Sequence, residues 1–260
     1  MTAIARAAAR APGRAPGRTM SEAEWSARVD LAALYRLFAR YGWTDLIYTH
    51  IAARVPGEPH AYLINPYGLM FDEITASSLL KVGLDGSGLD PGAAINPAGH
   101  LIHSAVLKAR PEIGFTLHSH TRAGIAVSAM SCGLLPLSQH AGEVLGTLAY
   151  HPYQDITAAA DECDALVRDL GSSYLLVMHN HGLLACGRSA VEAFLYLYRL
   201  EMACKVQVDV MSTGAKPILP RADAIESLKQ WGRPGEAARG AEEWSALLRM
   251  LDRGDPSYRS

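Results

Sequence analysis

The stretch Ile113-Gly-Phe-Thr-Leu-His-Ser-His-Thr121 has the alternation of a strand and ends in the pattern His-x-His. Because side chains on a strand alternate between its two faces, His118 and His120 project to the same side, roughly 7 Å apart at the backbone. A second pattern of this kind, His179-Asn-His181, follows the apolar run Tyr174-Leu-Leu-Val-Met178, where a strand ends and the chain turns. These residues fit either a metal site or a polar patch held by hydrogen bonds.

The composition suits one large α/β domain with a mildly acidic body. The chain has 260 residues, of which 49% are hydrophobic, and this is enough to form a substantial core. The formal net charge is -2, but residues 1–20 carry only arginine as charged residue, at positions 6, 10, 14 and 18, so the rest of the chain is at about -6. An acidic body argues against nucleic acid as the main partner.

Residues 1–20 form a low-complexity segment of alanine, arginine, proline and glycine, which we predict to be a disordered tail. The sequence has no apolar run of about 18 residues and no secretory signal, so we predict a cytoplasmic protein without a membrane partner. The cysteines are widely spaced and form no CxxC pair, which favours buried reduced thiols over a disulfide framework.

Hydrophobic spacing and turn residues predict alternating helices and strands. Amphipathic spacing with capping residues predicts helices over residues 21–41, 97–110, 121–130, 161–169, 190–212 and 222–230. Short apolar runs between turns predict strands over residues 48–55, 61–64, 81–84, 113–121, 134–137, 145–151 and 174–178. Hairpins mixed with helices predict a mixed or mainly antiparallel sheet covered by helices.

Five stretches carry a more specific signal, and they read Tyr48-Thr-His-Ile-Ala-Ala-Arg-Val-Pro-Gly57, Ile64-Asn-Pro-Tyr-Gly68, His103-Ser-Ala-Val-Leu-Lys-Ala-Arg-Pro111, His118-Ser-His120 and Asn180-His-Gly-Leu-Leu184. In content and order they resemble the class II aldolase/adducin domain, over about residues 22–212. Further segments resemble the bacterial adducin-like branch of that family, and they are Asp72-Glu-Ile-Thr-Ala76, Gly133-Leu-Leu-Pro-Leu137 and Ala149-Tyr-His-Pro-Tyr153.

The resemblance implies an α/β fold, a three-layer α/β/α sandwich with a central, largely antiparallel (mixed) sheet, assembled as a homotetramer. It also implies that His118, His120 and His181 bind one divalent metal ion per subunit, with zinc first and iron or manganese as alternatives. In the aldolases of the family this ion is a Lewis acid on the substrate oxygens while a carbon-carbon bond breaks. We therefore divide the chain into the tail, a metal-binding domain over residues 21–215, and a helical extension over residues 216–260 that packs at a subunit interface.

The sequence departs from the sugar-phosphate aldolases of this family at two places. Those enzymes carry Ser-Ser-Glu ahead of the family histidine, whereas counting back from His103 places Pro97-Ala98-Gly99 there. Gly99 therefore stands in place of the catalytic glutamate, and the small hydroxylated residues that help to hold phosphate are missing. The glycine-asparagine loop expected near residue 50 reads Thr49-His50. Both departures predict a small-molecule substrate without phosphate.

A lyase reaction also needs a group that moves a proton. The candidate acids and bases are Glu73, Tyr67, Glu143, His100 and His151. We expect Glu143 in a polar loop that closes on the site, and His100 one position after the missing glutamate. Candidates for substrate binding are Arg54, whose guanidinium can hold a carboxylate through two hydrogen bonds, and the turn residues Asn65 and Gly68.

These observations predict a divalent-metal-dependent carbon-carbon lyase. It would cleave or decarboxylate a small non-phosphorylated carbonyl compound or hydroxy acid through a metal-stabilised enolate. One alternative is a non-haem iron oxygenase for aromatic 2-oxo or 2-hydroxy acids, an activity found among similar proteins. The other alternative is a binding module without catalysis, which resembles the eukaryotic adducins, although those proteins lack the metal histidines that this chain keeps.

Overall fold

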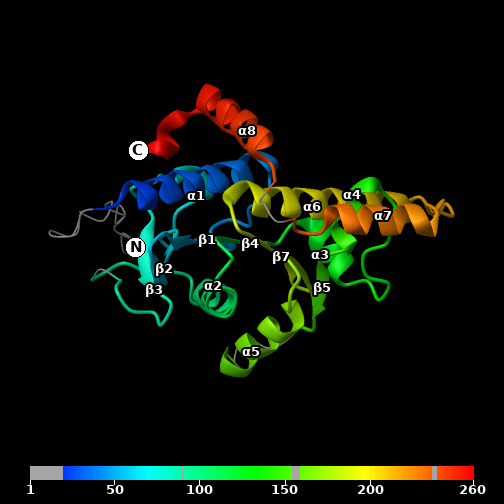
Figure 1. Ribbon diagram of the computed structural model, residues 1–260, viewed down its shortest axis with the longest axis horizontal. Coiled ribbons are helices and arrows are strands. Elements are labelled where there is room, and N and C mark those ends of the chain that lie inside the picture. The colour runs from blue at the N-terminus through cyan, green and yellow to red at the C-terminus, as the bar shows by residue number, and fades with distance from the viewer. Residues whose placement is uncertain (1–19, 90, 154–158, 236–238) are drawn as a thin grey trace, which may run out of the picture.

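In the described part of the chain, one mixed sheet of seven strands lies between two layers of helices (Figure 1). The computed structural model describes residues 20–89, 91–153, 159–235 and 239–260, so the predicted tail lies outside the described residues except for Met20. The strands are β1 (His50–Val55), β2 (Glu58–Ile64), β3 (Leu80–Gly83), β4 (Phe115–Ser119), β5 (Leu148–His151), β6 (Leu175–Met178) and β7 (Gly182–Gly187). Their order is β3-β2-β1-β4-β7-β6-β5, and only β5 and β6 pair in parallel. The α/β fold with a largely antiparallel sheet is thereby confirmed.

Long helices cover the two faces of the sheet. Helices α1 (Glu22–Tyr41) and α6 (Ala190–Ser212) pack on one face, where α1 contacts β1 and α6 contacts β4 and β7. Helices α2 (Pro97–Ala109) and α5 (Ala159–Leu170) lie on the other side of the sheet in Figure 1, where α2 contacts β1 and α5 contacts β5. The other described helices are α3 (Arg122–Ser128), α4 (Gln139–Leu145), α7 (Ala222–Gly232) and α8 (Ala241–Gly254), with single 3₁₀ turns at η1 (Phe71–Glu73) and η2 (Pro256–Arg259).

Helix α1 begins and ends where the sequence predicts. The Ser21 hydroxyl accepts a hydrogen bond from the Glu24 N–H at 3.1 Å, which satisfies one of the free donors at the helix start. At the other end Gly42 adopts a left-handed φ of 67°, a conformation that glycine reaches without strain. The face between these ends packs fully buried aromatic and aliphatic side chains onto the sheet, including Tyr35 and Phe38.

The buried Tyr35 hydroxyl fastens this helix to β1 and to the turn after β2. It donates to the Ile51 carbonyl at 2.5 Å and accepts from the Ile51 N–H at 3.0 Å. It also lies 2.8 Å from Asn65 Oδ1, so the Asn65 side chain is engaged inside the fold. These contacts satisfy backbone groups that water does not reach.

Strand β4 is central in the sheet, and all five of its residues are buried. On one side it pairs with β1, with His118 opposite His50. On the other side it pairs with β7, with His118 opposite Leu184. Three segments far apart in the sequence therefore meet at the carboxyl end of β4.

Three details of the structure differ from the sequence prediction. The strand predicted over residues 134–137 is wrong, because side chains satisfy the backbone there: the Leu134 N–H donates to the Tyr150 hydroxyl and the Leu135 N–H to Gln207 Oε1. The polar loop around Glu143 is helix α4, whose first turn is capped by the Ser138 hydroxyl. Strand β7 was not separated from the histidine turn, because both of its faces are buried and its sequence therefore lacks alternation.

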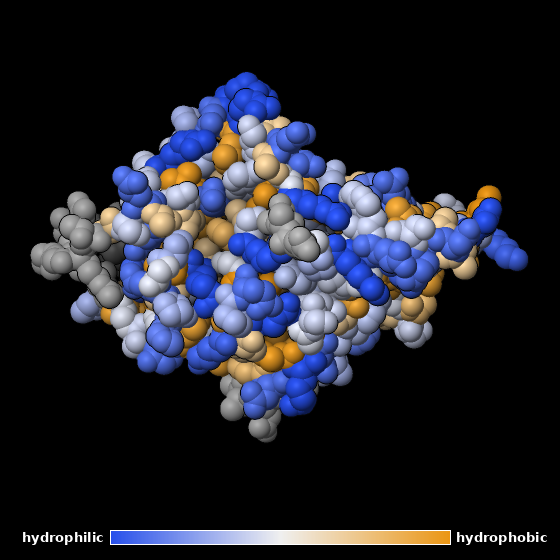
Figure 2. Space-filling model, viewed as in Figure 1, coloured by the Kyte–Doolittle hydropathy of each residue, from blue (hydrophilic) through white to orange (hydrophobic). Residues whose placement is uncertain are grey.

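The C-terminal segment packs on its own chain. Helix α7 contacts α4, and helix α8 contacts α1 and α6, where the Trp244 indole N–H donates to Asp30 at 3.2 Å. Ile218 and Leu219, between α6 and α7, are exposed, and Figure 2 shows hydrophobic residues at the projecting end of the molecule. The subunit contact of residues 216–260 stays a prediction. In the described part of the chain, no helix combines the length and apolar character that crossing a membrane requires.

We expect the Tyr35→Phe substitution to lower the free energy of unfolding by about 1–3 kcal/mol, because it leaves buried groups of Ile51 and Asn65 without their hydrogen-bond partner. Urea denaturation monitored by circular dichroism measures this change. Tyr153, which is 60% exposed, offers the matched control Tyr153→Phe, which should leave the stability unchanged. Equal midpoints for Tyr35→Phe and the control would contradict this account of the helix contact.

Candidate metal centre

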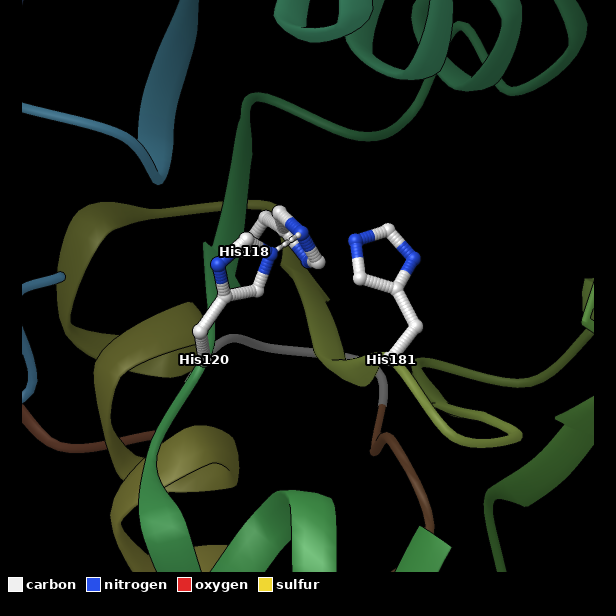
Figure 3. A group of neighbouring side chains, drawn as sticks. All are labelled: His118, His120 and His181. Carbon is white, nitrogen blue, oxygen red and sulfur yellow. Dashed lines mark hydrogen bonds between the residues drawn. The ribbon is translucent and has the colours of Figure 1, made fainter. Parts of the chain in front are cut away.

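Three histidines converge at the carboxyl end of β4 (Figure 3). His118 belongs to β4, His120 follows directly after it, and His181 lies in the turn between β6 and β7. Each histidine has one ring nitrogen that lies within 4.8 Å of a ring nitrogen of each of the other two. The ring centroids are 4.7 to 4.9 Å apart, so the structure brings together the three histidines that the sequence singles out.

The pairing of β4 with β7 creates this convergence. It continues as far as Ser119, so the turn that carries His181 comes to lie beside His120. Asn180 takes the left-handed φ of 56° in that turn, which asparagine tolerates better than most residues. A Cβ atom at Gly182 would lie 2.3 Å from the Ser119 carbonyl oxygen, so the strands can approach this closely only because the residue is glycine.

Hydrogen bonds fix which nitrogen of two rings is free. His118 Nδ1 lies 3.0 Å from the Leu183 carbonyl oxygen, and His120 Nδ1 lies 3.0 Å from Asp45 Oδ2. Because both partners are acceptors, each Nδ1 carries the hydrogen and each Nε2 keeps its lone pair. These two Nε2 atoms face each other at 2.9 Å. Two facing lone pairs repel each other, and a shared cation removes that repulsion, so the donor set fits a metal ion.

Burial favours the neutral, metal-binding form of His118 and His181. It lowers the pKa of His181 to about 4, with further lowering by the neighbouring rings of His120 and His151. The pKa of His118 also lies well below its usual value, first because of burial and then because of the imidazoles around it, including His50. At neutral pH a proton therefore does not compete with a metal ion for the lone pairs of His118 and His181.

A cavity of about 360 Å³ opens beside the histidines. Its described lining residues are Asp45, Tyr48, Thr49, His50, Tyr67, Asn96, Ala98, Leu101, Ile102, His118, His120, Cys163, Leu166 and His181. Beside the three histidines the wall has polar side chains, and α2 and α5 contribute aliphatic ones. This volume is of the size that holds a small organic molecule.

Comparison with known proteins identifies the fold family. Residues 29–208 match the family model described as Class II Aldolase and Adducin N-terminal domain. The chain belongs to this family. The resemblance noted in the sequence is thereby confirmed.

Relatives within the class II aldolase and adducin family include bacterial and animal proteins. A protein of Caulobacter vibrioides, provisionally named a class 2 aldolase, is 50% identical over 242 residues, which cover 92% of this chain and 94% of the relative. Alpha-adducin of Mus musculus is 42% identical over 241 residues, which cover 86% of this chain but 33% of the adducin. The chain thus spans nearly the whole bacterial relative and about a third of the animal one.

Solved structures show the same architecture. An aldolase II superfamily protein from Pseudomonas syringae superposes with a TM-score of 0.87 at 45% identity, over 92% of this chain and 97% of that chain. An L-fuculose 1-phosphate aldolase from Glaciozyma antarctica PI12 superposes with a TM-score of 0.78 at 25% identity, over 95% of this chain and 97% of that chain. Both comparisons extend well beyond the histidine cluster.

A fourth imidazole, His50, lines the same cavity and was not among the residues predicted for the site. It lies at the start of β1, and its ring centroid is 5.0 Å from that of His118. A Cβ atom at Gly99 would lie 2.8 Å from the His50 ring, so this ring occupies the space next to the position of the missing family glutamate. The sequence signal was the unusual Thr49-His50 pair, which gains its meaning only from the pairing of β1 with β4.

Of the five candidate acids and bases, only Tyr67 is among the described residues that line the cavity. Glu73 accepts a hydrogen bond from the Met70 N–H at 2.7 Å and caps η1. Glu143 is buried in α4 and pairs with Arg199 of α6 at 2.7 Å. His100 Nδ1 lies 2.8 Å from the Tyr62 hydroxyl. The latter three side chains have partners that hold them elsewhere in the fold.

The residues predicted to bind substrate also have structural partners. The Arg54 guanidinium donates to four backbone carbonyls, those of Ile113, Pro59, Leu107 and Arg110, at 2.6 to 3.2 Å. Asn65 contacts Tyr35, and Gly68 forms a turn with a φ of 102°. None of these three is among the described residues that line the cavity. The sequence shows that these residues can line a polar site, but it does not show which hydrogen-bond partners the fold gives them.

His151 lies close enough to His181 to influence its pKa. Its Nδ1 lies 2.7 Å from Asp169, and its Nε2 is buried without a hydrogen-bond partner among the described residues. The structure therefore places this candidate beside the metal centre rather than in the described cavity lining.

Mild acid should destabilise the metal-free protein. Burial lowers the pKa of His103 to about 3, whereas the unfolded chain has the ordinary value of about 6.5. The contribution of His103 to the free energy of unfolding is therefore fully present above pH 6.5. It falls as the pH drops, because the unfolded chain then binds a proton that the folded chain excludes. From this group alone we expect a loss of about 2 kcal/mol between pH 7 and pH 5.

Urea titrations at both pH values, with a chelator present, measure this loss. The exposed His60 provides a control, because His60→Gln should leave the pH dependence unchanged. Equal unfolding free energies at pH 7 and pH 5 would contradict the neutral state assigned to His103.

Proposed function

We propose that this chain binds one divalent metal ion through His118, His120 and His181 and is a metal-dependent carbon-carbon lyase. The observation that carries the proposal is the pair of Nε2 lone pairs facing each other at 2.9 Å, with His181 beside them. Membership of the class II aldolase and adducin family supports the same conclusion. When bound, the ion supplies a Lewis acid that stabilises negative charge on substrate oxygens.

Zinc is the ion that we propose first. Neutral imidazoles are common zinc ligands, and three protein ligands with an open position are typical of catalytic zinc sites. Asp45 favours this choice, because its carboxylate holds His120 Nδ1 at 3.0 Å and so orients a ligand ring. Non-haem iron sites more often use a carboxylate together with two histidines as direct ligands. Iron and manganese are the alternatives that metal analysis would distinguish.

The chain's own residues prepare the site for a small substrate. The Leu183 carbonyl and Asp45 orient two of the ligand rings, so little reorganisation is needed when a metal ion binds. Tyr67 reaches the cavity and is the residue we propose to exchange a proton with the substrate. Leu101 and Leu166 in the cavity wall exclude water from the apolar part of the substrate.

The cavity wall favours a substrate without phosphate. The described lining residues include no lysine and no arginine, the side chains that most often hold phosphate groups. Gly99 and Ala98 stand where the sugar-phosphate aldolases carry a glutamate and a hydroxylated residue. We therefore propose aldol cleavage or decarboxylation of a small non-phosphorylated carbonyl compound or hydroxy acid.

The double substitution His118→Ala/His120→Ala should remove the bound metal, because it leaves only one of the three ligands. Elemental analysis of the untagged protein measures this loss, and far-ultraviolet circular dichroism checks the fold. His60→Ala is the matched control, since it changes an exposed histidine, and it should keep about one metal ion per chain. Stoichiometric metal in the double variant would refute the ligand assignment.

A substrate panel tests the reaction class. Zinc-loaded protein should release an aldehyde or carbon dioxide from at least one small 2-oxo or hydroxy acid, and chelation should abolish this turnover. L-fuculose 1-phosphate should not be cleaved, because the cavity offers no cationic group to its phosphate among the described residues. Efficient cleavage of L-fuculose 1-phosphate would contradict the proposal of a substrate without phosphate. Oxygen consumption by iron-loaded protein, without lyase activity, would favour the oxygenase.

A further inference from the structure

His50 lies beside the three histidines proposed to bind the metal, but it is not one of the proposed ligands. Its ring lines the cavity, is tilted 30° to the His118 ring, and occupies the space that faces Gly99. The three metal-binding nitrogens do not include an atom of His50. The family glutamate is thus replaced by glycine in the sequence, while an imidazole from another strand fills the adjoining space.

Two consecutive hydrogen bonds, from Thr116 through His103, hold the His50 ring in place. His50 Nδ1 lies 2.9 Å from His103 Nε2, and His103 Nδ1 lies 2.7 Å from the Thr116 hydroxyl. The three side chains come from β1, α2 and β4, and all of them are buried. His50 lines the cavity, and its hydrogen bond in this series uses Nδ1, so Nε2 remains for a ligand.

The direction of these hydrogen bonds follows from the donors available. The Thr116 hydroxyl has its only side-chain hydrogen bond within the described residues to His103, so it satisfies its hydrogen by donating to His103 Nδ1. His103 then carries its hydrogen on Nε2 and donates to His50 Nδ1. His50 in turn carries its hydrogen on Nε2. The reverse direction would leave a buried threonine hydroxyl without an acceptor, at a cost of about 1–3 kcal/mol.

Both nitrogens of the His103 ring are thereby engaged, one as a donor and the other as an acceptor. The outcome is a neutral imidazole at position 50 that presents a donor to the cavity.

We propose that His50 donates its Nε2–H to the substrate oxygen that gains negative charge during cleavage, and that His103 and Thr116 are positioning residues for this donor. The proposal rests on the proposed function, which supplies that oxygen. A preorganised donor next to developing charge stabilises the transition state more than the ground state. A neutral imidazole suits this role, because it offers a hydrogen bond while staying uncharged beside a cation.

Nitrogen NMR of protein labelled with ¹⁵N-histidine tests the donor state directly. The zinc-loaded and metal-free proteins should both show His50 as the Nε2–H tautomer, with its signals assigned by their loss in His50→Gln. Thr116→Ser keeps the hydroxyl and should preserve that tautomer, whereas Thr116→Val should shift the His50 signals toward a mixture. An Nδ1–H tautomer in the wild-type protein would overturn the proposal whatever metal is bound.

Binding of acetohydroxamate to the zinc-loaded protein tests the contact with a charged oxygen. This probe carries two adjacent oxygens, one of them anionic, as an enediolate does. Calorimetry should show affinity lowered about 10- to 100-fold in His50→Phe, which has no donor, and largely retained in His50→Gln, whose amide N–H replaces it. His60→Phe, at an exposed histidine, is the matched control and should bind as the wild type does.

The possible failures are distinguishable. Equal affinity in His50→Phe and the wild type, with equal zinc content, would overturn the role of His50 and leave the proposed function standing. Absence of any stoichiometric divalent metal from the wild-type protein would overturn the proposed function, and with it the acceptor for this donor. His50→Gln guards against misfolding of the phenylalanine variant, because its loss of acetohydroxamate binding with an intact fold would also contradict the donor role.

Discussion

The pairing of β4 with β1 on one side and with β7 on the other is the constraint on which the rest of this structure depends. It brings His50, His118 and the turn of His181 to one place, although they are far apart in the sequence. Backbone hydrogen bonds in a buried sheet leave little freedom in register, because a one-residue slip would turn every side chain to the other face. The same pairing requires that β7 approach β4 closely at Gly182, where any side chain would clash with the β4 backbone.

Four histidines at or near the cavity fall into two groups with different partners. His118 and His120 donate from Nδ1 to an oxygen atom, so their outer nitrogens are free to bind a cation. His50 and His103 contact each other, and Thr116 satisfies the last nitrogen of that series. Burial lowers the pKa of His50, His103 and His118, which suits metal binding at His118 but makes the fold sensitive to acid. The same desolvation therefore links the chemistry of the site to the stability of the protein.

Much of the fold was predictable because its signals are local. Capping at Ser21 and the spacing of apolar residues define α1, and motif resemblance led to the family that the comparisons confirm. Strand β7 escaped prediction because it is buried on both faces and lacks alternation. The helix around Glu143 was missed because its stability comes from the Ser138 cap and from packing against α6 and α7.

The site was predictable to the extent that residue spacing governs it. A strand places every second side chain on one face whatever surrounds it, so the sequence by itself determined that His118 and His120 project together. Only the tertiary structure decided that Arg54 serves backbone carbonyls, that Glu143 pairs with Arg199, and that His50 joins the cavity. The physical reason is that a polar side chain acquires its role from its hydrogen-bond partners, and in this fold those partners come from segments that the sequence does not place side by side.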